Sequence, residues 1–317
     1  MDDITAVLAA AFPDRSVAET IPTGPSWNPA TRTVGVRFTD GRRAFLKAMT
    51  DGNGSRVARE RAVIEFVGAR CDVRVPTVLA SNPEGEVPYL ATAPIPGESV
   101  VAAWHDWTDA ERATAARQVG RALAGVHAAT FDGHGHVDGG DAEGLTVESK
   151  PWTDVLVDTI ETLRELSPSD RFDHRFDDVV AAVEANRDVL DDVPATLLHG
   201  DPAKPNCIRG DDDVALLDWE NAHVGDPARD LYRARAQQLD GIRTAAADRL
   251  VEALHEGYRE RAGALPAGFA ERRPVYRAVR FLGTAGFVDR TAEYVDESAD
   301  EFAEWVDAEL GRRLGEL

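Results

Sequence analysis

The chain changes character at Pro94-Ile95-Pro96-Gly97, and no other feature of the sequence constrains its fold as strongly. Before this connector, short stretches rich in β-branched and aromatic residues alternate with turn residues, a pattern typical of antiparallel strands. The dipeptide Asp40-Gly41 favours a tight turn between two of them. Five strands are predicted, at Ser16–Ile21, Thr33–Phe38, Arg43–Ala48, Thr77–Ala80 and Val87–Ala93.

Helical periodicity dominates after the connector, because apolar residues there recur at intervals of three and four. Helices are predicted at Asp109–Thr130, Trp152–Leu166, Phe176–Leu190 and over most of 231–317, with two earlier ones at Asp2–Phe12 and Ser55–Ala69. An island of strands and turns interrupts the helical part at 195–221. We therefore expect an α+β fold with two lobes. The N-lobe (1–93) would hold a five-stranded antiparallel sheet plus a helix, and the C-lobe (94–317) would be mainly helical, with a hinge at about 92–97.

The island at 195–221 contains the residues best suited to catalysis. Asp201 and Asn206 lie five positions apart in a Pro-rich loop, and Asp218 follows an apolar strand at Val214–Leu217. A strand–loop–strand turn that brings these side chains together forms an all-oxygen site, which Mg²⁺ prefers and shares with substrate phosphates. The carboxylate that is left over from metal binding can accept a proton from a hydroxyl nucleophile.

Lysine is rare in this chain, which has 33 Asp, 23 Glu and 32 Arg but only Lys47, Lys150 and Lys204. Such an acidic, Asp-rich and Lys-poor composition resembles that of proteins from halophilic archaea, whose carboxylates hold hydrated cations at molar salt. A GC-rich genome also replaces Lys with Arg, but it does not explain the excess of Asp, so we favour the halophilic interpretation. Where lysine is so scarce, each remaining one is expected to have a specific role.

Lys47 stands in an apolar strand, and Glu60 follows thirteen residues later on the next predicted helix. An ordinary surface ion pair is the alternative, and such a pair contributes little to stability. The order of parts favours a function instead: a strand lysine, a helix glutamate, an aspartate loop and a metal-binding aspartate follow one another as in kinases. Phosphoryl transfer needs little more than this positioning and charge neutralisation.

These motifs resemble the aminoglycoside phosphotransferase (APH) and choline kinase-like family of small-molecule kinases, which has a protein-kinase-like bilobal fold. The resemblance rests on motifs in the family's order between Gly24 and Leu231. They are His199-Gly200-Asp201 with Asn206, Asp218-Trp219-Glu220, Gly225-Asp226-Pro227 with Asp230-Leu231, Arg59-Glu60-Arg61-Ala62, Pro88-Tyr89-Leu90 with Pro96-Gly97, and Val126-His127-Ala128. The last 85 residues match only in being helical.

The resemblance implies ATP or GTP as co-substrate and Mg²⁺ as cofactor. It implies Asn206 and Asp218 as the metal ligands and Asp201 as the catalytic residue. The implied nucleotide-binding residues are Lys47, Glu60, Ser26, Thr92, Ala93 and Ile95. Lys47, fixed by Glu60, would bind the α- and β-phosphates, and the hinge backbone at Thr92–Ile95 would contact the base. Ser26 belongs to the loop Gly24–Asn28, which departs from the family pattern in lacking a second glycine.

Four supporting residues are implied as well: His199, Lys204, Glu220 and Asp230. His199 is expected to hold the catalytic loop rather than act as a general base, and Asp230 to accept hydrogen bonds from the backbone of that loop. The loop interior, Pro202-Ala203-Lys204-Pro205, departs from the family pattern. Lys204 either touches the transferred phosphate or is a solvated loop lysine. A second His cluster, His134-Gly135-His136, is interpreted as part of a Gly-rich surface loop rather than a metal site.

The charge excludes several classes of partner. With 56 acidic and 35 basic residues the formal net charge is −21, so nucleic acid and anionic membranes repel the chain. No run of 18 apolar residues occurs, and Met1-Asp2-Asp3 lacks the cationic start of a signal peptide. We expect a cytoplasmic monomer or homodimer whose partners are a nucleotide and a small-molecule acceptor.

The acceptor hydroxyl stays open at this stage, because the family acts on amino alcohols, sugars and aminoglycosides. Two alternatives to a small-molecule kinase also stay open. A non-catalytic nucleotide-binding module is disfavoured by the complete set of Lys, Glu, Asp, Asn and Asp. A protein kinase is disfavoured because Gly225-Asp226-Pro227 follows so soon after Asp218-Trp219-Glu220 that no activation loop fits between them.

Overall fold

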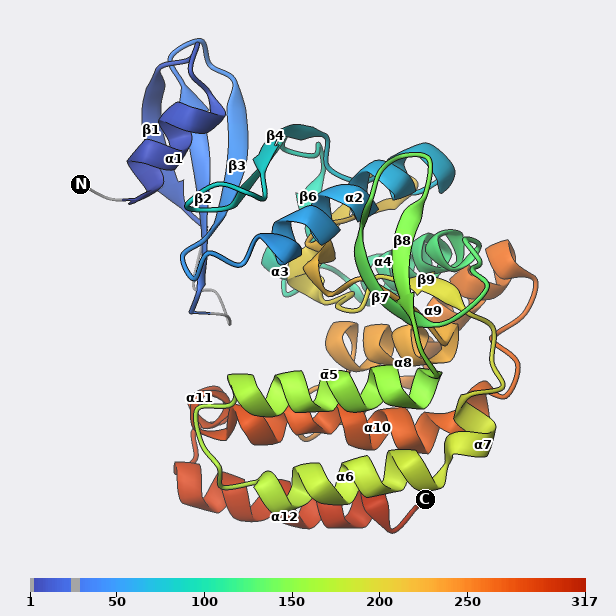
Figure 1. Cartoon of the computed structure of the whole chain (residues 1–317). Coiled ribbons are helices and arrows are strands. Elements are labelled where there is room, and N and C mark those ends of the chain that lie inside the picture. Colours follow the sequence, from blue (N-terminus) through green and yellow to red (C-terminus); the bar gives the residue numbers. More distant parts are fainter. Residues whose placement is uncertain (1–2, 24–28) are drawn as a thin grey trace.

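The computed structural model describes residues 3–23 and 29–317, so the predicted phosphate-binding residue Ser26 lies outside the described residues (Figure 1). Helix α1 (Asp3–Ala11) opens the N-lobe. The N-lobe sheet contains β1 (Val17–Pro22), β2 (Thr31–Phe38), β3 (Arg43–Met49), β4 (Val78–Asn82) and β5 (Tyr89–Thr92), in the order β1-β2-β3-β5-β4. Every neighbouring pair is antiparallel, which confirms the predicted sheet.

Two hydrophobic clusters divide the N-lobe. The smaller one lies between α1 and the sheet, and it includes Ile4 and Leu8 of the helix with Val36 and Leu46 of the strands. Helix α2 (Gly54–Arg70) belongs to the larger cluster, because its buried residues join the apolar side chains of the C-lobe. The helix that carries Glu60 is therefore packed against the C-lobe as well as against the N-lobe.

Helices make up most of the C-lobe. They are α3 (Val100–Ala103), α4 (Asp109–His127), α5 (Trp152–Leu166), α6 (Asp173–Ala185), α7 (Arg187–Leu190), α8 (Pro227–Gln238), α9 (Asp248–Ala262), α10 (Phe269–Gly286), α11 (Val288–Ala292) and α12 (Ala299–Leu314). Helices α5, α6, α10 and α12 lie side by side at the end of the molecule farthest from the N-lobe sheet (Figure 1). No helix among the described residues is long and apolar enough to cross a membrane.

Two small sheets lie in the C-lobe. One contains β6 (Glu98–Ser99), β10 (Cys207–Arg209) and β11 (Val214–Leu216), in the order β11-β10-β6. The other contains β7 (Gly135–Gly140), β8 (Leu145–Ser149), β9 (Thr196–Leu198) and β12 (His223–Gly225), in the order β8-β7-β12-β9. Short 3₁₀ turns, η1 (Lys204–Asn206) and η2 (Trp219–Asn221), connect these strands.

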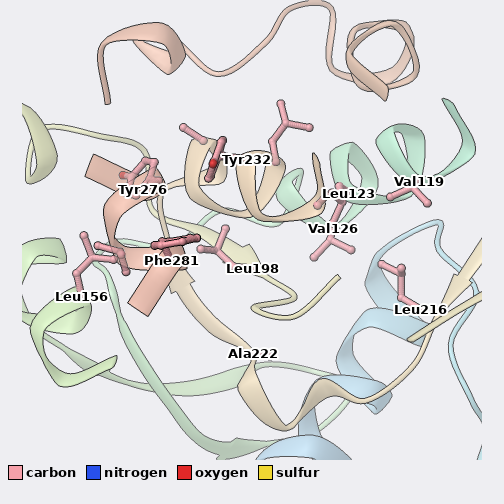
Figure 2. Close-up of a cluster of buried hydrophobic side chains, with 14 of the residues drawn as sticks. Val119, Leu123, Val126, Leu156, Leu198, Leu216, Ala222, Tyr232, Tyr276 and Phe281 are labelled. Carbon is pink, nitrogen blue, oxygen red and sulfur yellow. The ribbon is translucent and has the colours of Figure 1, made fainter. Parts of the chain in front are cut away.

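The hydrophobic core anchors the strands that carry the predicted site. Figure 2 shows this core with Val119, Leu123 and Val126 from α4, Leu156 from α5, Tyr232 from α8, Tyr276 and Phe281 from α10, and Leu198 and Leu216 from the short strands. Leu198 and Leu216 are fully buried. Leu198 directly precedes the His199 loop and Leu216 lies two residues before Asp218, so core packing fixes both segments.

The interpretation of the His134-Gly135-His136 region as a surface loop is wrong. Strands β7 and β8 form a hairpin there, and β7 also pairs with β12. The two imidazoles have separate partners: His134 Nε2 donates to the carbonyl oxygen of Val193 at 3.1 Å, and His136 Nε2 contacts Asp158 Oδ2 at 3.2 Å. A glycine-rich sequence carries little strand signal, so partners distant in sequence decide its conformation.

Candidate active site

Lys47 lies on β3, which is held along both edges by β2 and β5. Its two neighbours in the strand are fully buried, and side chains alternate along a strand, so Lys47 points to the opposite face. There its ammonium contacts three carboxylates, Glu60 Oε2 at 2.9 Å, Asp218 Oδ1 at 2.5 Å and Glu220 Oε2 at 2.8 Å. The structure thus brings the predicted strand lysine, helix glutamate and metal aspartate together.

The Lys47–Glu60 pair is not an ordinary surface pair, since the two side chains are only 13% and 6% exposed. Burial opposes the charge on Lys47, but Asp218, Glu60 and Glu220 together raise its pKa well above the usual value. Burial raises the pKa of Glu60 to about 7, against the opposing effect of Lys47. Strongly shifted pKa values of this kind are concentrated at functional sites.

The oxygen atoms near the lysine fit a divalent cation. Glu60, Asp218 and Glu220 each offer one carboxylate oxygen, and these atoms lie within 4.8 Å of one another. The three carboxylates outnumber the single lysine, so the cluster carries excess negative charge, and carboxylate oxygens are the ligands that Mg²⁺ prefers. The backbone carbonyl oxygen of Asn206 accepts a hydrogen bond from the N–H of Leu217, next to Asp218, at 2.9 Å, while its side-chain amide donates to Asp201.

The backbone at Asp218 adopts an unusual conformation. Its φ of 64° and ψ of 70° lie in the left-handed region, which non-glycine residues rarely occupy. Aspartate and asparagine tolerate this region better than other side chains do. The turn lies between β11 and η2, and it directs the chain so that both Asp218 and Glu220 reach Lys47. Strained backbone of this kind is concentrated at functional sites.

Asp201 is held from three sides. Its Oδ1 accepts hydrogen bonds from Arg233 Nη2 at 3.0 Å and Gln237 Nε2 at 2.5 Å, and its Oδ2 accepts one from Asn206 Nδ2 at 3.2 Å. Burial alone would raise the pKa of Asp201, but the charge of Arg233 and these hydrogen bonds hold it below the usual value. Asp201 is therefore ionised at neutral pH. Its carboxylate can orient a hydroxyl group and accept its proton.

The loop that carries Asp201 is fixed by His199 and Asp230. The backbone N–H groups of His199 and Gly200 donate to the carboxylate of Asp230 at 2.8 and 3.1 Å. The His199 ring donates from Nε2 to the carbonyl oxygen of Leu217 at 2.9 Å and accepts from the N–H of Asp201 at Nδ1, at 3.2 Å. Burial lowers the pKa of His199, so the ring is neutral. It bridges the two segments that carry Asp201 and Asp218.

The hinge backbone offers few groups to a nucleotide base. The N–H of Ala93 donates to the carbonyl oxygen of Thr77 at 2.8 Å, and Pro94 has no N–H group. Thr92 is the last residue of β5, and Ile95 is half-buried beyond it. Beyond β5, the backbone groups of the described hinge that are left for a base are the carbonyl oxygens of Ala93 and Pro94 and the N–H of Ile95.

Lys204 does not behave as a solvated loop residue. Its ammonium lies 4.4 Å from the centroid of the ring of Trp104, the residue that follows α3. This is a favourable distance for a cation–π interaction. Burial lowers the pKa of Lys204. Lys204 therefore joins the catalytic loop to the start of the C-lobe.

Sequence reasoning did not identify Arg233 and Gln237 as site residues, although both donate hydrogen bonds to Asp201. Both lie on α8, one turn apart, and no local motif marks them. Arg233 also lines a cavity of about 10 Å³ between α8 and α10, whose wall includes Arg229 and Arg280. A larger hollow of about 490 Å³ lies between α2 and residues 73–78, and it contains none of the site residues.

A family comparison agrees with this geometry. The model of the phosphotransferase enzyme family, APH, matches residues 30–275. The chain belongs to this family. The predicted enzyme class, a phosphotransferase of the small-molecule kinase type, is thereby confirmed, and so is the predicted resemblance to APH proteins. No curated protein sequence matches the chain significantly.

Solved structures similar to this APH-family chain share its fold. A thermostable mutant of aminoglycoside phosphotransferase APH(4)-Ia, in a ternary complex with ADP and hygromycin B, matches with a TM-score of 0.65 and 15% identity over 99% of this chain and 98% of the other. A putative fructosamine-3-kinase from Thermobifida fusca matches with a TM-score of 0.63 and 20% identity, over 98% of this chain and 99% of the other. Macrolide 2'-phosphotransferase MphH from Brachybacterium faecium matches with a TM-score of 0.58 and 21% identity, over 95% of this chain and 97% of the other. The predicted kinase-like fold is confirmed.

Proposed function

We propose that this APH-family chain catalyses the Mg²⁺-dependent transfer of the γ-phosphate of ATP or GTP to a hydroxyl group of a small molecule. The ion pair between Lys47 of the N-lobe and Asp218 of the C-lobe carries the proposal. It puts the candidate phosphate-binding cation next to the candidate metal ligand. A positioned cation, a metal held by oxygen ligands and a carboxylate that orients the nucleophile are the parts that phosphoryl transfer requires.

The nucleotide would bind to groups of both lobes. Lys47, oriented by Glu60, would contact the α- and β-phosphates, and the backbone of Thr92, Ala93 and Ile95 would contact the base through the groups left free. Support comes from a relative of the same fold that is solved with ADP. The predicted role of Ser26 remains part of this proposal.

Asn206 and Asp218 would hold Mg²⁺, and Glu220 would support them from the same turn. When bound, the ion would neutralise the charge that develops on the phosphates and help to align them. His199 and Asp230 act as positioning residues, because they hold the loop of Asp201 against the segment of Asp218. Lys204 would hold the later part of this loop against Trp104, at the start of the C-lobe.

Asp201 would orient the acceptor hydroxyl toward the γ-phosphorus. As the acceptor oxygen forms its bond to this phosphorus, the bond from phosphorus to the β-phosphate oxygen breaks, the hydroxyl proton passes to Asp201, and ADP or GDP leaves. Because Arg233, Gln237 and Asn206 stabilise the ionised form of Asp201, it is a weak base. Its main contribution is then orientation, with proton acceptance late in the transfer.

Release of ADP or GDP in the presence of Mg²⁺, measured against a panel of amino alcohols, sugars, aminoglycosides, macrolides and fructosamines, tests the proposal. We expect Asp201→Asn to lower turnover by about 100-fold to 10,000-fold, the range for removal of a general base. Asp218→Asn keeps a side chain that tolerates the left-handed conformation, and we expect it to lower turnover by about 1,000-fold or more through loss of the metal.

Asp212→Asn is the matched control, because Asp212 lies exposed in the nearby turn between β10 and β11. It should keep the turnover of the unaltered chain. Wild-type turnover in Asp218→Asn would contradict the metal assignment. Tight nucleotide binding without turnover on any acceptor would instead favour a non-catalytic nucleotide-binding module.

A further inference from the structure

The charge of the molecule reverses locally on the two helices next to Asp201. The chain carries a net charge of −21, yet α8 contains three arginines and one acid, and α10 contains four arginines and one acid. The acid of α8, Asp230, is occupied by the backbone of the catalytic loop. The acid of α10, Glu271, lies exposed in the first turn of its helix. In these helices, no acid remains to bind a cationic substrate beside Asp201.

Three of these seven arginines, Arg229, Arg273 and Arg280, have no carboxylate partner within the described part of the chain, and of the three only Arg229 and Arg280 line the small cavity beside Asp201. Four others form ion pairs: Arg233 with Asp201, Arg235 with Asp240, Arg272 with Asp226, and Arg277 with Glu316. Arg229 is almost fully buried and donates to His223 Nε2 at 3.0 Å. Arg280 has an enclosed Nε without a hydrogen-bond partner.

Arg280 faces the same small cavity as Arg233 and lies close enough to Asp201 for their charges to interact. Burial, followed by the charge of neighbouring Arg233, lowers the pKa of Arg280 to about 10. At neutral pH its guanidinium therefore stays charged. A cation whose Nε is enclosed and that makes no direct ion pair is costly, unless an anion binds there.

We propose that the acceptor is an anionic alcohol, with its carboxylate or phosphate group bound by Arg233 and Arg280 and its hydroxyl group directed at Asp201. This proposal rests on the proposed function and names the substrate class of the same site. Guanidinium groups bind carboxylate and phosphate through paired hydrogen bonds, which makes arginine well suited to this recognition.

The geometry around Asp201 suggests how such an acceptor enters. The cavity of about 10 Å³ has room for roughly one water molecule. Arg233 and Gln237 both donate to Oδ1 of Asp201, so this oxygen has little capacity left for a hydroxyl group. An anionic group that draws Arg233 away both widens the cavity and frees Oδ1 for the acceptor. Recognition of the anion and exposure of the catalytic carboxylate are then one event.

Titration calorimetry with small alcohols of matched size and different charge tests the proposal. The probes are D-glycerate and sn-glycerol 3-phosphate as anions, glycerol as the neutral compound and 2-amino-1,3-propanediol as the cation, at constant ionic strength. The full chain is titrated with and without Mg²⁺ and a non-hydrolysable ATP analogue. We expect at least one anion to bind about tenfold or more tightly than glycerol or the cation. The two anions distinguish a carboxylate acceptor from a phosphorylated one.

Arg280→Gln should weaken binding of the preferred anion by about tenfold, with unchanged affinity for glycerol and for the nucleotide. Arg280→Lys keeps the charge and should retain part of the anion affinity. Arg277→Gln is the matched control, because it removes the same charge from α10 but its partner is Glu316. It should leave anion binding unchanged. Circular dichroism checks that each variant is folded.

Three results would overturn the proposal. They are tighter binding of the cation than of either anion, no binding of either anion at about 20 mM, and equal effects of Arg280→Gln and Arg277→Gln. A loss of nucleotide affinity in Arg280→Gln as large as the loss for the anion would assign the cations to the transferred phosphate instead. Failure of the proposed function shows itself separately, as absent nucleotide binding and absent turnover, because the anion titration without nucleotide does not depend on either.

Discussion

Asp230 is a residue whose charge holds the backbone of the catalytic loop. Its carboxylate is fully buried and accepts hydrogen bonds from two consecutive backbone N–H groups, those of His199 and Gly200. Burial opposes the charge, but the contact with His127 and the nearby His199 and Arg229 side chains outweigh it and hold the pKa of Asp230 far below the usual value. An amide at this position can accept from these donors only through its oxygen, and its NH₂ group would face one of them.

Asp230→Asn should therefore destabilise the folded chain at pH 7 by about 2 kcal/mol, the scale of a charge-assisted hydrogen bond. Because the folded pKa of Asp230 is depressed, its stabilising effect is complete above the unfolded pKa of about 4 and is lost as the pH falls through the lower folded value. Urea unfolding at pH 7 and at pH 4 measures the difference between the two proteins. A difference that grows as the pH falls would contradict this assignment.

The residues of the candidate site were predictable to different degrees. Asp201, Asn206 and Asp218 could be identified because one loop and one strand bring them together, so sequence spacing carries the information. Arg280 could not be identified, because it reaches Asp201 only when α10 packs beside α8, and nothing local marks that contact. Residues that act through long-range packing leave no motif.

At the scale of the elements, α4 and α9 form the most extensive helix pair of the described fold. Their axes approach closely because a glycine on each helix faces the backbone of the other. A Cβ atom on Gly120 would lie 2.0 Å from the carbonyl oxygen of Leu254, and one on Gly257 would lie 1.9 Å from that of Arg117. Helix α4 also carries His127, which contacts Asp230 at 3.4 Å. The packing of this pair therefore supports the site.

Gly120→Ala should destabilise the chain by about 1 kcal/mol, because overpacking a core costs about 2 kcal/mol in the middle of its range and part of this cost is offset. The gain in helix propensity is about 1 kcal/mol and is smaller than this cost. The control is Gly139→Ala in β7, where a Cβ atom meets nothing within 4 Å. Thermal unfolding should show a clearly lower midpoint for Gly120→Ala than for Gly139→Ala. Equal midpoints would show that the helices separate without cost.

Elements with strong local signals were predicted well, whereas those held by distant partners were not. The helix at Trp152–Leu166 is found as predicted, since its apolar residues recur at helical spacing over its whole length. The segment Phe176–Leu190 was predicted as one helix but forms α6 and α7, which are separated at Asn186. The hairpin of β7 and β8 was missed because its glycines favour a loop, and only pairing with β12 and packing on α2 make it a sheet.

For the whole molecule, the balance of charge sets how stability responds to salt. Surface ion pairs such as Arg117 with Glu256 and Glu260 lose strength as salt increases. Each such exposed pair contributes about 0 to 1 kcal/mol, and many contribute nothing measurable. The repulsion among the surplus acids acts on the whole surface at once and is also screened. With a net charge of −21, the relief of repulsion should exceed the loss of ion pairs.

The melting temperature should therefore rise as KCl is increased from about 0.1 M to 1 M, because the screening length falls from about 10 Å to about 3 Å over this range. Most of the rise should come at the lower concentrations, where the screening length shortens most. Differential scanning calorimetry measures the midpoint at each concentration. Sucrose at matched osmolality is the control, since it favours compact states without screening charge. A melting temperature that rises equally in sucrose, or that falls as KCl increases, would show that repulsion among the acids does not limit the stability of this chain.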